Sequence, residues 1–178
     1  MKKLPILLFI SFFLSMSMLT AASSHADYIH SYLENFRICR TGAITDNYGY
    51  LVFNQNTAVY SGIPKGLADY LDKELSAGNY IEDVCITEGG AWICVGDNIQ
   101  GYEYPPSLWG KISELLRQGD HITCITFNDF GDWMVVSNNH FSSSNNFIQQ
   151  TMLETSNEYG FIQSVAMTNY NCIIIAHN

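Results

Sequence analysis

The sequence predicts an α+β fold of about four tandem β-β-β-α repeats, arranged as an arc or a small propeller-like ring with the helices on one side. Three observations lead to this prediction. Similar residues recur at an offset of 41, each interval holds a helical stripe followed by strand-like segments, and the intervals fill the chain after an N-terminal leader. A unit of about 41 residues cannot bury its helix stripe and both sheet faces alone, so neighbouring units must stack.

The offset of 41 is carried by seven matched pairs of residues. A third copy keeps this spacing from Gly119 to Gly160 and then loses one residue, and a weaker first copy lies upstream at an offset of 42. The repeat domain is therefore predicted over residues 27–178, with copies at approximately 27–62, 63–103, 104–145 and 146–178. The seven pairs are Pro64 and Pro105, Leu67 and Leu108, Leu71 and Ile112, Leu75 and Leu116, Gly78 and Gly119, Ile81 and Ile122, and Trp92 and Trp133.

The leader has the pattern of a secretory signal peptide. Lys2 and Lys3 precede an apolar run from Leu4 to Leu19, and small residues ending at Ala26 mark a cleavage site. The run is too short, and too closely followed by that site, to suit a membrane span. We therefore expect a signal peptide over residues 1–26 and a secreted or periplasmic protein that has no membrane attachment after cleavage.

The charge of the chain excludes some classes of partner. There are 8 Lys and Arg residues against 17 Asp and Glu, a formal net charge of −9. Removal of the predicted leader, residues 1–26, also removes Lys2 and Lys3 and leaves 152 residues with a charge of −11. Binding to phosphates requires a cationic surface, so nucleic acid and anionic lipid do not suit this chain. We expect a protein or a glycan as the partner.

Each copy is predicted to begin with a helix. In the second copy Pro64 supplies the fixed φ of a first helical position, and Gly78 supplies an end signal. Leu67, Leu71 and Leu75 recur between them at helical spacing and form one apolar stripe. The next copy has the same stripe, made of Leu108, Ile112, Leu115 and Leu116.

Three strands are predicted to follow each helix. In the second copy the first strand runs from Ile81 to Thr87, a turn follows at residues 88–90, and the return strand runs from Ala91 to Val95. A short third strand is expected from Gln100 to Tyr104. The unit therefore has the order β-β-β-α when it is counted from its first strand.

The third and fourth copies vary this pattern. Strands are expected over residues 122–127 and 133–137, but the polar segment at residues 142–146 predicts a loop where the third strand should be. The terminal run of residues 172–176 is uniformly apolar, which predicts a strand covered on both faces. Such a strand would be an aggregation hazard as an open edge, which favours a closed ring over an arc.

Two segments of the sequence resemble repeats in other proteins. Residues 162–166, and residues 133–137 with Gly131 before them, resemble tandem repeats of uncharacterised secreted bacterial proteins. They are also similar to a repeat domain of unknown function in plant casein-kinase-like proteins. The second strand of those repeats reads Gly-x-Trp-apolar-Val-apolar, and this chain keeps the tryptophan at Trp92 and Trp133. The resemblance implies a repeat architecture and assigns no catalytic residues.

The five cysteines leave two interpretations open. If the hairpin pairs Thr87 with Trp92, then Cys85 lies opposite Cys94, and an exported protein could form a disulfide between them. The alternative is that both are small buried apolar residues. The odd number of cysteines leaves at least one without a partner in the chain.

The sequence lacks the motifs of common enzymes. It contains no Gly-x-Ser-x-Gly, no His-Glu-x-x-His and no phosphate-binding loop. Residues 128–132 group an amide and two carboxylates, but Asn, Asp and Gly are also the residues that tight turns select. We therefore predict no catalytic residues, no metal site and no cofactor. The alternatives are a small cysteine- or histidine-dependent hydrolase and a secreted enzyme inhibitor.

Aromatic residues supply the predicted binding surface. Trp92 and Trp133 occupy a repeated position that predicts packing in the core. Tyr60, Tyr102 and Tyr104 fall on or beside the short third strands, where an aromatic ring with a polar tip suits contact with a protein or a sugar. The leading hypothesis is a secreted, non-enzymatic repeat domain that binds through a Tyr-rich, acidic surface.

Overall fold

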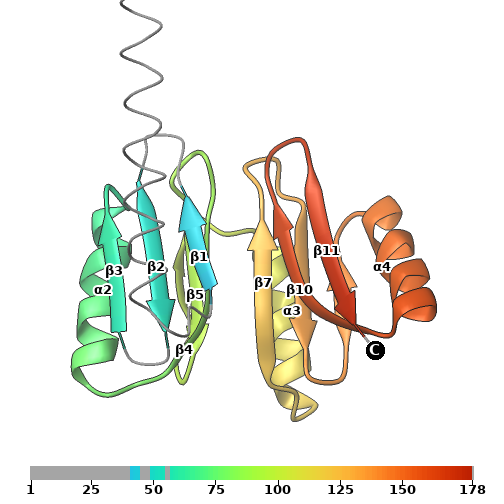
Figure 1. Ribbon diagram of the computed structural model, residues 1–178, viewed down its shortest axis with the longest axis horizontal. Coiled ribbons are helices and arrows are strands. Elements are labelled where there is room, and N and C mark those ends of the chain that lie inside the picture. Colours follow the sequence, from blue (N-terminus) through green and yellow to red (C-terminus); the bar gives the residue numbers. More distant parts are fainter. Residues whose placement is uncertain (1–40, 45–48, 55–56, 178) are drawn as a thin grey trace, which may run out of the picture. The chain divides into compact units, whose positions relative to one another are not determined.

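The chain folds as an α+β protein, as the sequence predicts. The computed structural model describes residues 41–44, 49–54 and 57–177. Within these residues it contains three helices and four small antiparallel sheets of two or three strands (Figure 1). The predicted signal peptide, residues 1–26, and most of the predicted first copy lie outside the described residues.

The elements follow the order β-β-β-α three times, and a pair of strands comes last. The helices are α2 (Lys65–Ser76), α3 (Pro106–Arg117) and α4 (Asn146–Tyr159). The strands are β1 (Thr41–Ile44), β2 (Tyr50–Asn54), β3 (Thr57–Ser61), β4 (Ile81–Ile86), β5 (Trp92–Gly96), β6 (Gln100–Tyr102), β7 (Ile122–Phe127), β8 (Trp133–Ser137), β9 (Phe141–Ser143), β10 (Phe161–Met167) and β11 (Cys172–His177).

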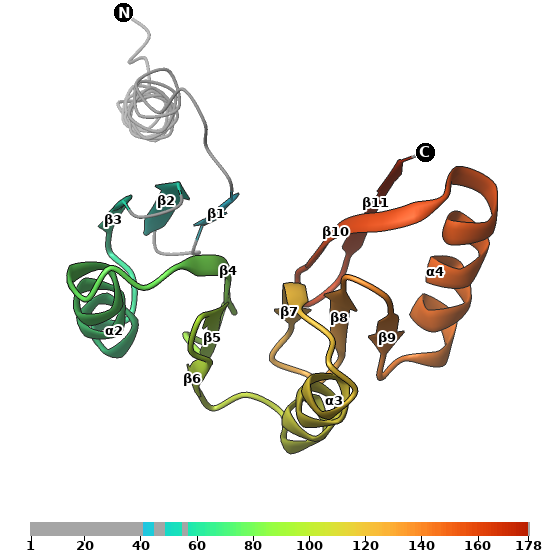
Figure 2. The ribbon, with the colours of Figure 1, turned by 90° about the horizontal axis from the view of Figure 1, so that it is seen from below.

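The first strand of each sheet contacts the first strand of the next. The strand orders are β1-β2-β3, β4-β5-β6, β7-β8-β9 and β10-β11. Strand β4 contacts both β1 and β7, and β7 also contacts β10. Figure 2 shows these four strands following one another on the inner side of the sheets, with the three helices on the outer side.

The helix ends follow from the residues that sequence reasoning singled out. Pro64 and Pro105 are the residues immediately before α2 and α3, so α2 begins one residue later than the first helical position predicted at Pro64. Gly78, Gly119 and Gly160, spaced by 41, have φ of 78°, 86° and 92° as the chain leaves each helix. This left-handed backbone favours glycine, which explains why a glycine recurs there.

The helix stripes and the tryptophans enter the core with one exception. Leu67 and Leu108 are fully buried, and Trp92 and Trp133 are buried as predicted. Leu116, which was expected to match Leu75, is 44% exposed. The neighbouring Leu115 is buried in its place, so the apolar stripe of α3 passes through Leu108, Ile112 and Leu115.

Two predictions about the strands are wrong. Residues 141–143 form the short strand β9, so the third sheet has the third strand that the polar segment was expected to interrupt. In β11 only one face is covered: Ile174 and Ala176 pack against a core cluster, whereas Ile173 and Ile175 are 61% and 50% exposed. Among the described strands, β11 pairs with β10 alone.

No helix in the described part of the chain is long and apolar enough to cross a membrane.

Candidate binding cavity at the strand bulges

The same irregularity occurs near the start of three inner strands. The pairing register shifts between Ile81 and Asp83 in β4, between Ile122 and Cys124 in β7, and between Ile162 and Ser164 in β10. Each shift is a β-bulge, which inserts one extra residue and re-aims the neighbouring side chains. The extra residues are Glu82, Thr123 and Gln163.

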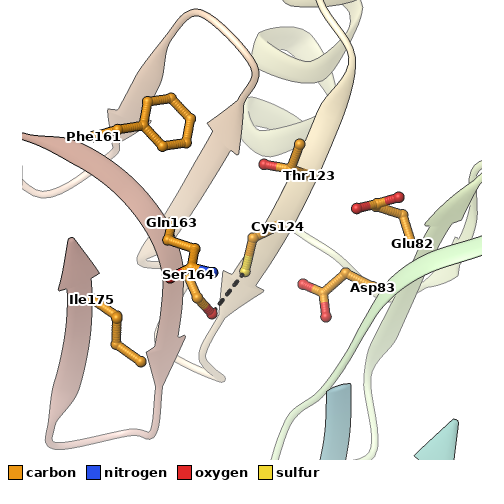
Figure 3. Close-up of a pocket in the computed structure, with 8 residues that line it drawn as sticks. All are labelled: Glu82, Asp83, Thr123, Cys124, Phe161, Gln163, Ser164 and Ile175. Carbon is orange, nitrogen blue, oxygen red and sulfur yellow. Dashed lines mark hydrogen bonds between the residues drawn. The ribbon is translucent and has the colours of Figure 1, made fainter. Parts of the chain in front are cut away.

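The bulges place six polar or thiol side chains around one cavity. Its volume is about 490 Å³, and each of the three strands contributes its extra residue and the residue that follows. Figure 3 shows these side chains, with Phe161 of β10 and Ile175 of β11 completing the lining. The six bulge residues are Glu82, Asp83, Thr123, Cys124, Gln163 and Ser164.

Two buried carboxyl groups make the β4 side of the cavity acidic. Glu82 and Asp83 are 6% and 7% exposed. Asp83 Oδ2 accepts a hydrogen bond of 2.9 Å from the backbone N–H of Ile125, which fixes β4 to β7. Glu82 Oε2 lies 3.6 Å from Nε2 of His121, whose side chain is largely exposed. The two carboxylates thus supply hydrogen-bond acceptors to the cavity, and the contacts of Asp83 with Ile125 and of Glu82 with His121 hold them in position.

Cys124 is a structural thiol. Its Sγ donates to the carbonyl of Val165 at 3.3 Å and accepts from the Val165 N–H at 3.5 Å, so it joins β7 to β10. Ser164 Oγ lies 3.8 Å from the same sulfur (Figure 3). Burial and the nearby charge of Asp83 raise the pKa of the Cys124 thiol far above its usual range. A thiol that stays protonated at neutral pH is a poor nucleophile.

A second cavity touches all four inner strands. It has a volume of about 310 Å³ and is lined by Gly42 and Ala43 of β1 together with segments of β4, β7 and β10. Asp83, Cys124 and Ser164 line both cavities. The two cavities therefore adjoin at these three residues.

The three predicted binding tyrosines are not brought into one site. Tyr60 packs against the core beside α2, and its hydroxyl donates to Asp72, which raises the pKa of Tyr60 to about 12. Tyr104 packs against a different core cluster and contacts the ring of Trp109, with 6.0 Å between centroids. Tyr102 is 55% exposed on β6. The three side chains therefore have different surroundings, and a binding role for them stays a prediction.

The predicted cross-strand relation between Cys85 and Cys94 is wrong by one residue. The hairpin pairs Ile86, rather than Thr87, with Trp92, so Cys85 faces Ile93 and Cys94 faces Val84. This shift places the two thiols on opposite faces of the sheet, and both are free and buried. Burial raises the pKa of Cys85 to about 11 and that of Cys94 to about 12. Cys85 and Cys94 therefore match the second interpretation of the sequence, in which both are small buried residues that form no disulfide with each other.

The acidic turn at residues 128–132 has an internal explanation. Asn128 Oδ1 accepts hydrogen bonds from the backbone N–H groups of Phe130 at 3.1 Å and Asp132 at 3.0 Å. Gly131 has a φ of 88°, which suits glycine. In the part of the chain that the structure describes, no three His, Cys, Asp or Glu side chains are grouped so that they could hold a metal ion.

Comparison with known proteins identifies no relative of this chain. No family model, no curated protein and no solved structure matches it. The resemblance to secreted bacterial and plant repeats therefore stays a prediction, and we infer function from the geometry of the cavities.

The bulge residues escaped sequence reasoning, although a signal for them exists. Glu82, Thr123 and Gln163 each follow an isoleucine of the repeat, at offsets of 41 and 40. The residue types differ from copy to copy at these positions, which share only their polarity. Polar residues at one repeated position directly after a buried isoleucine are the pattern that could have located the cavity.

Proposed function

We propose that the protein is an exported, non-enzymatic repeat domain that binds a glycan in the bulge cavity, defined by Glu82, Asp83, Thr123, Cys124, Gln163 and Ser164. The proposal includes the repeat architecture: residues 27–178 form tandem β-β-β-α units that follow one another as an open arc. The contacts from β1 to β4, from β4 to β7 and from β7 to β10 support the arc, as does the bulge that recurs in three strands.

The composition of the bulge cavity is the observation that carries the glycan assignment. Carboxylate, amide and hydroxyl groups from three strands converge there, and they match the donors and acceptors of sugar hydroxyls. Phe161 is 48% exposed at the cavity, where its ring can pack against the apolar face of a sugar. A concave site with a few convergent polar groups and an aromatic wall is typical of ligand binding.

The chemistry of the site favours binding over catalysis. A cysteine nucleophile needs a lowered pKa, whereas burial and the neighbouring carboxylate of Asp83 raise the pKa of Cys124, and its sulfur is held by the backbone of Val165. His121 pairs with Glu82, and His140 pairs with Asp120. Neither of these imidazoles is among the hydrogen-bond partners of the Cys124 thiol in the described part of the chain, which argues against the hydrolase alternative.

A glycan array tests the proposal. We expect the protein to bind a subset of oligosaccharides, and Phe161→Ala and Gln163→Ala to weaken that binding about five- to tenfold, which corresponds to roughly 1–1.4 kcal/mol. Both side chains are exposed, so the variants should fold normally. Phe147→Ala is the matched control, because Phe147 is 80% exposed on α4 and does not line the cavity. An array without binding, or equal losses in the control, would overturn the proposal.

A further inference from the structure

The turns that follow β4, β7 and β10 are joined to one another. The backbone N–H of Gly89 donates to Asp129 Oδ2 at 2.9 Å, and the N–H of Asp129 donates to Asn169 Oδ1 at 3.0 Å. The Asn169 side-chain amide also donates to Glu88 Oε2 at 2.8 Å. These turns follow the C-terminal ends of the inner strands, whereas the bulges lie near the N-terminal ends. The joined turns are therefore a separate surface from the bulge cavity.

This surface carries an exposed aromatic pair. Phe130 and Tyr170 are 67% and 81% exposed, and their rings meet edge to face with centroids 6.0 Å apart. Large exposed aromatic side chains that hold each other in place are characteristic anchors of interaction sites. Glu88 and Asp129 lie in the same joined turns, so the aromatic pair is flanked by carboxylates.

A groove adjoins the aromatic pair. It has a volume of about 680 Å³, and Phe130 forms part of its lining together with Tyr104, Pro105 and Phe127. Two acidic residues, Glu103 and Asp129, line it as well, and no Lys or Arg side chain does. The groove therefore offers apolar walls of aromatic rings and proline beside acidic groups.

We propose that this groove binds an extended, arginine-bearing segment of a cationic partner protein. A guanidinium group stacks on aromatic faces and forms charge-assisted hydrogen bonds to carboxylates, which are the two kinds of group present. Aromatic and proline walls suit an extended peptide backbone. The formal charge of −9 attracts a cationic partner at long range, so the association should weaken as salt screens that charge.

Two matched peptides test this site. One is a decapeptide of alternating arginine and proline, and the other has the same length with citrulline, which is uncharged, in place of arginine. By isothermal titration calorimetry at low salt we expect the arginine peptide to bind, and the citrulline peptide to bind at least tenfold more weakly, as loss of charge-assisted hydrogen bonds predicts. Phe130→Ala and Glu103→Gln should each weaken the arginine peptide about tenfold.

The controls separate this site from the glycan site and from general charge. Phe147→Ala and Glu154→Gln alter an exposed ring and an exposed carboxylate on α4, and they should leave peptide binding unchanged. Phe130→Ala should keep glycan binding, whereas Phe161→Ala should keep peptide binding. Glu103→Gln keeps the size of an exposed side chain, so it tests the site even if Phe130→Ala destabilises the fold. Equal binding of the two peptides, no binding of either, or equal losses in the α4 variants would overturn the inference.

Discussion

The side-chain amide of Asn169 donates to the carboxylate of Glu88 at 2.8 Å, across 81 positions of the sequence. The same amide lies 3.0 Å from Asp129 Oδ2, so one side chain joins the turns of three successive sheets. The contacts place the turns of these three sheets within side-chain reach of one another.

Replacing Asn169 should loosen this junction. Asn169→Ala removes hydrogen bonds to Glu88 and Asp129, and we expect the free energy of unfolding to fall by about 1–2 kcal/mol. Asn169→Asp should cost more at low salt, because it places a third carboxylate beside two others, and salt should relieve part of the loss. Urea unfolding at two salt concentrations measures both effects. Asn171→Ala, in the same turn, is the control, and an equal loss there would contradict the assignment.

Asp83 should stabilise the joint between β4 and β7 through its oxygen rather than its charge. Asp83→Ala leaves the buried N–H of Ile125 without its acceptor, and we expect a loss of about 1–3 kcal/mol in urea unfolding. Asp83→Asn keeps an oxygen in the same place and should lose much less. If both variants lost the same amount, the negative charge would be the important property and the hydrogen bond would not.

The hydrogen bonds of the Asp120 carboxylate predict that the protein loses stability in strong acid. Its carboxylate accepts hydrogen bonds from Asn139 Nδ2 at 2.8 Å and Ser137 Oγ at 2.7 Å, and His140 Nδ1 lies at 2.6 Å. These partners lower the pKa of Asp120 from 3.8 to about 2. Because the folded-state pKa lies below the unfolded value, this stabilisation is complete above about pH 4 and is lost as the pH falls towards 2.

Acid unfolding of two variants measures the contribution of Asp120. Asp120→Asn should lower stability at neutral pH and flatten its dependence between about pH 4 and pH 2. Asp69→Asn, which removes an exposed carboxylate on α2, should leave that part of the curve unchanged. If Asp120→Asn showed the same dependence of stability on pH as the wild type, Asp120 would not be the group that titrates.

The described cysteines should differ sharply in reactivity. Cys85, Cys94 and Cys124 are buried with raised pKa values, whereas Cys172 is exposed. Since the thiolate is the reactive form, iodoacetamide at pH 7.5 should modify Cys172 in the native protein and spare the other three. Peptide mass mapping locates the label, and Cys172→Ser should abolish labelling of that peptide. Rapid labelling of Cys124 would instead favour the hydrolase alternative.

The sequence predicted the helices and strands well because each is marked by local chemistry. Proline before α2 and α3, glycine after every helix, and an apolar stripe on α2 and α3 fix the helices within one or two residues. Strand β4 ends at Ile86, one residue before the predicted end at Thr87. The strands that repeat at an offset of 41 were found for the same reason, since each depends on its own residues.

Features set by pairing between strands were harder to predict. Trp92 pairs with Ile86 rather than with Thr87, the predicted partner. This difference of one residue in register places Cys85 on the opposite face of the sheet from Cys94. The bulges at Glu82, Thr123 and Gln163 likewise depend on the partner strand. The burial of each face of β11 depends on the elements packed against that face, and the apolar composition of the strand does not specify these elements.

The recurring bulge separates the residues that hold the protein together from those that would choose its ligand. Ile81, Ile122 and Ile162 are buried and keep their identity, whereas the position directly after each of them is occupied by Glu, Thr or Gln. Under the proposed glycan binding, substitutions at Thr123 and Gln163 would change the ligand that is preferred, while the buried isoleucines before them would keep the core intact.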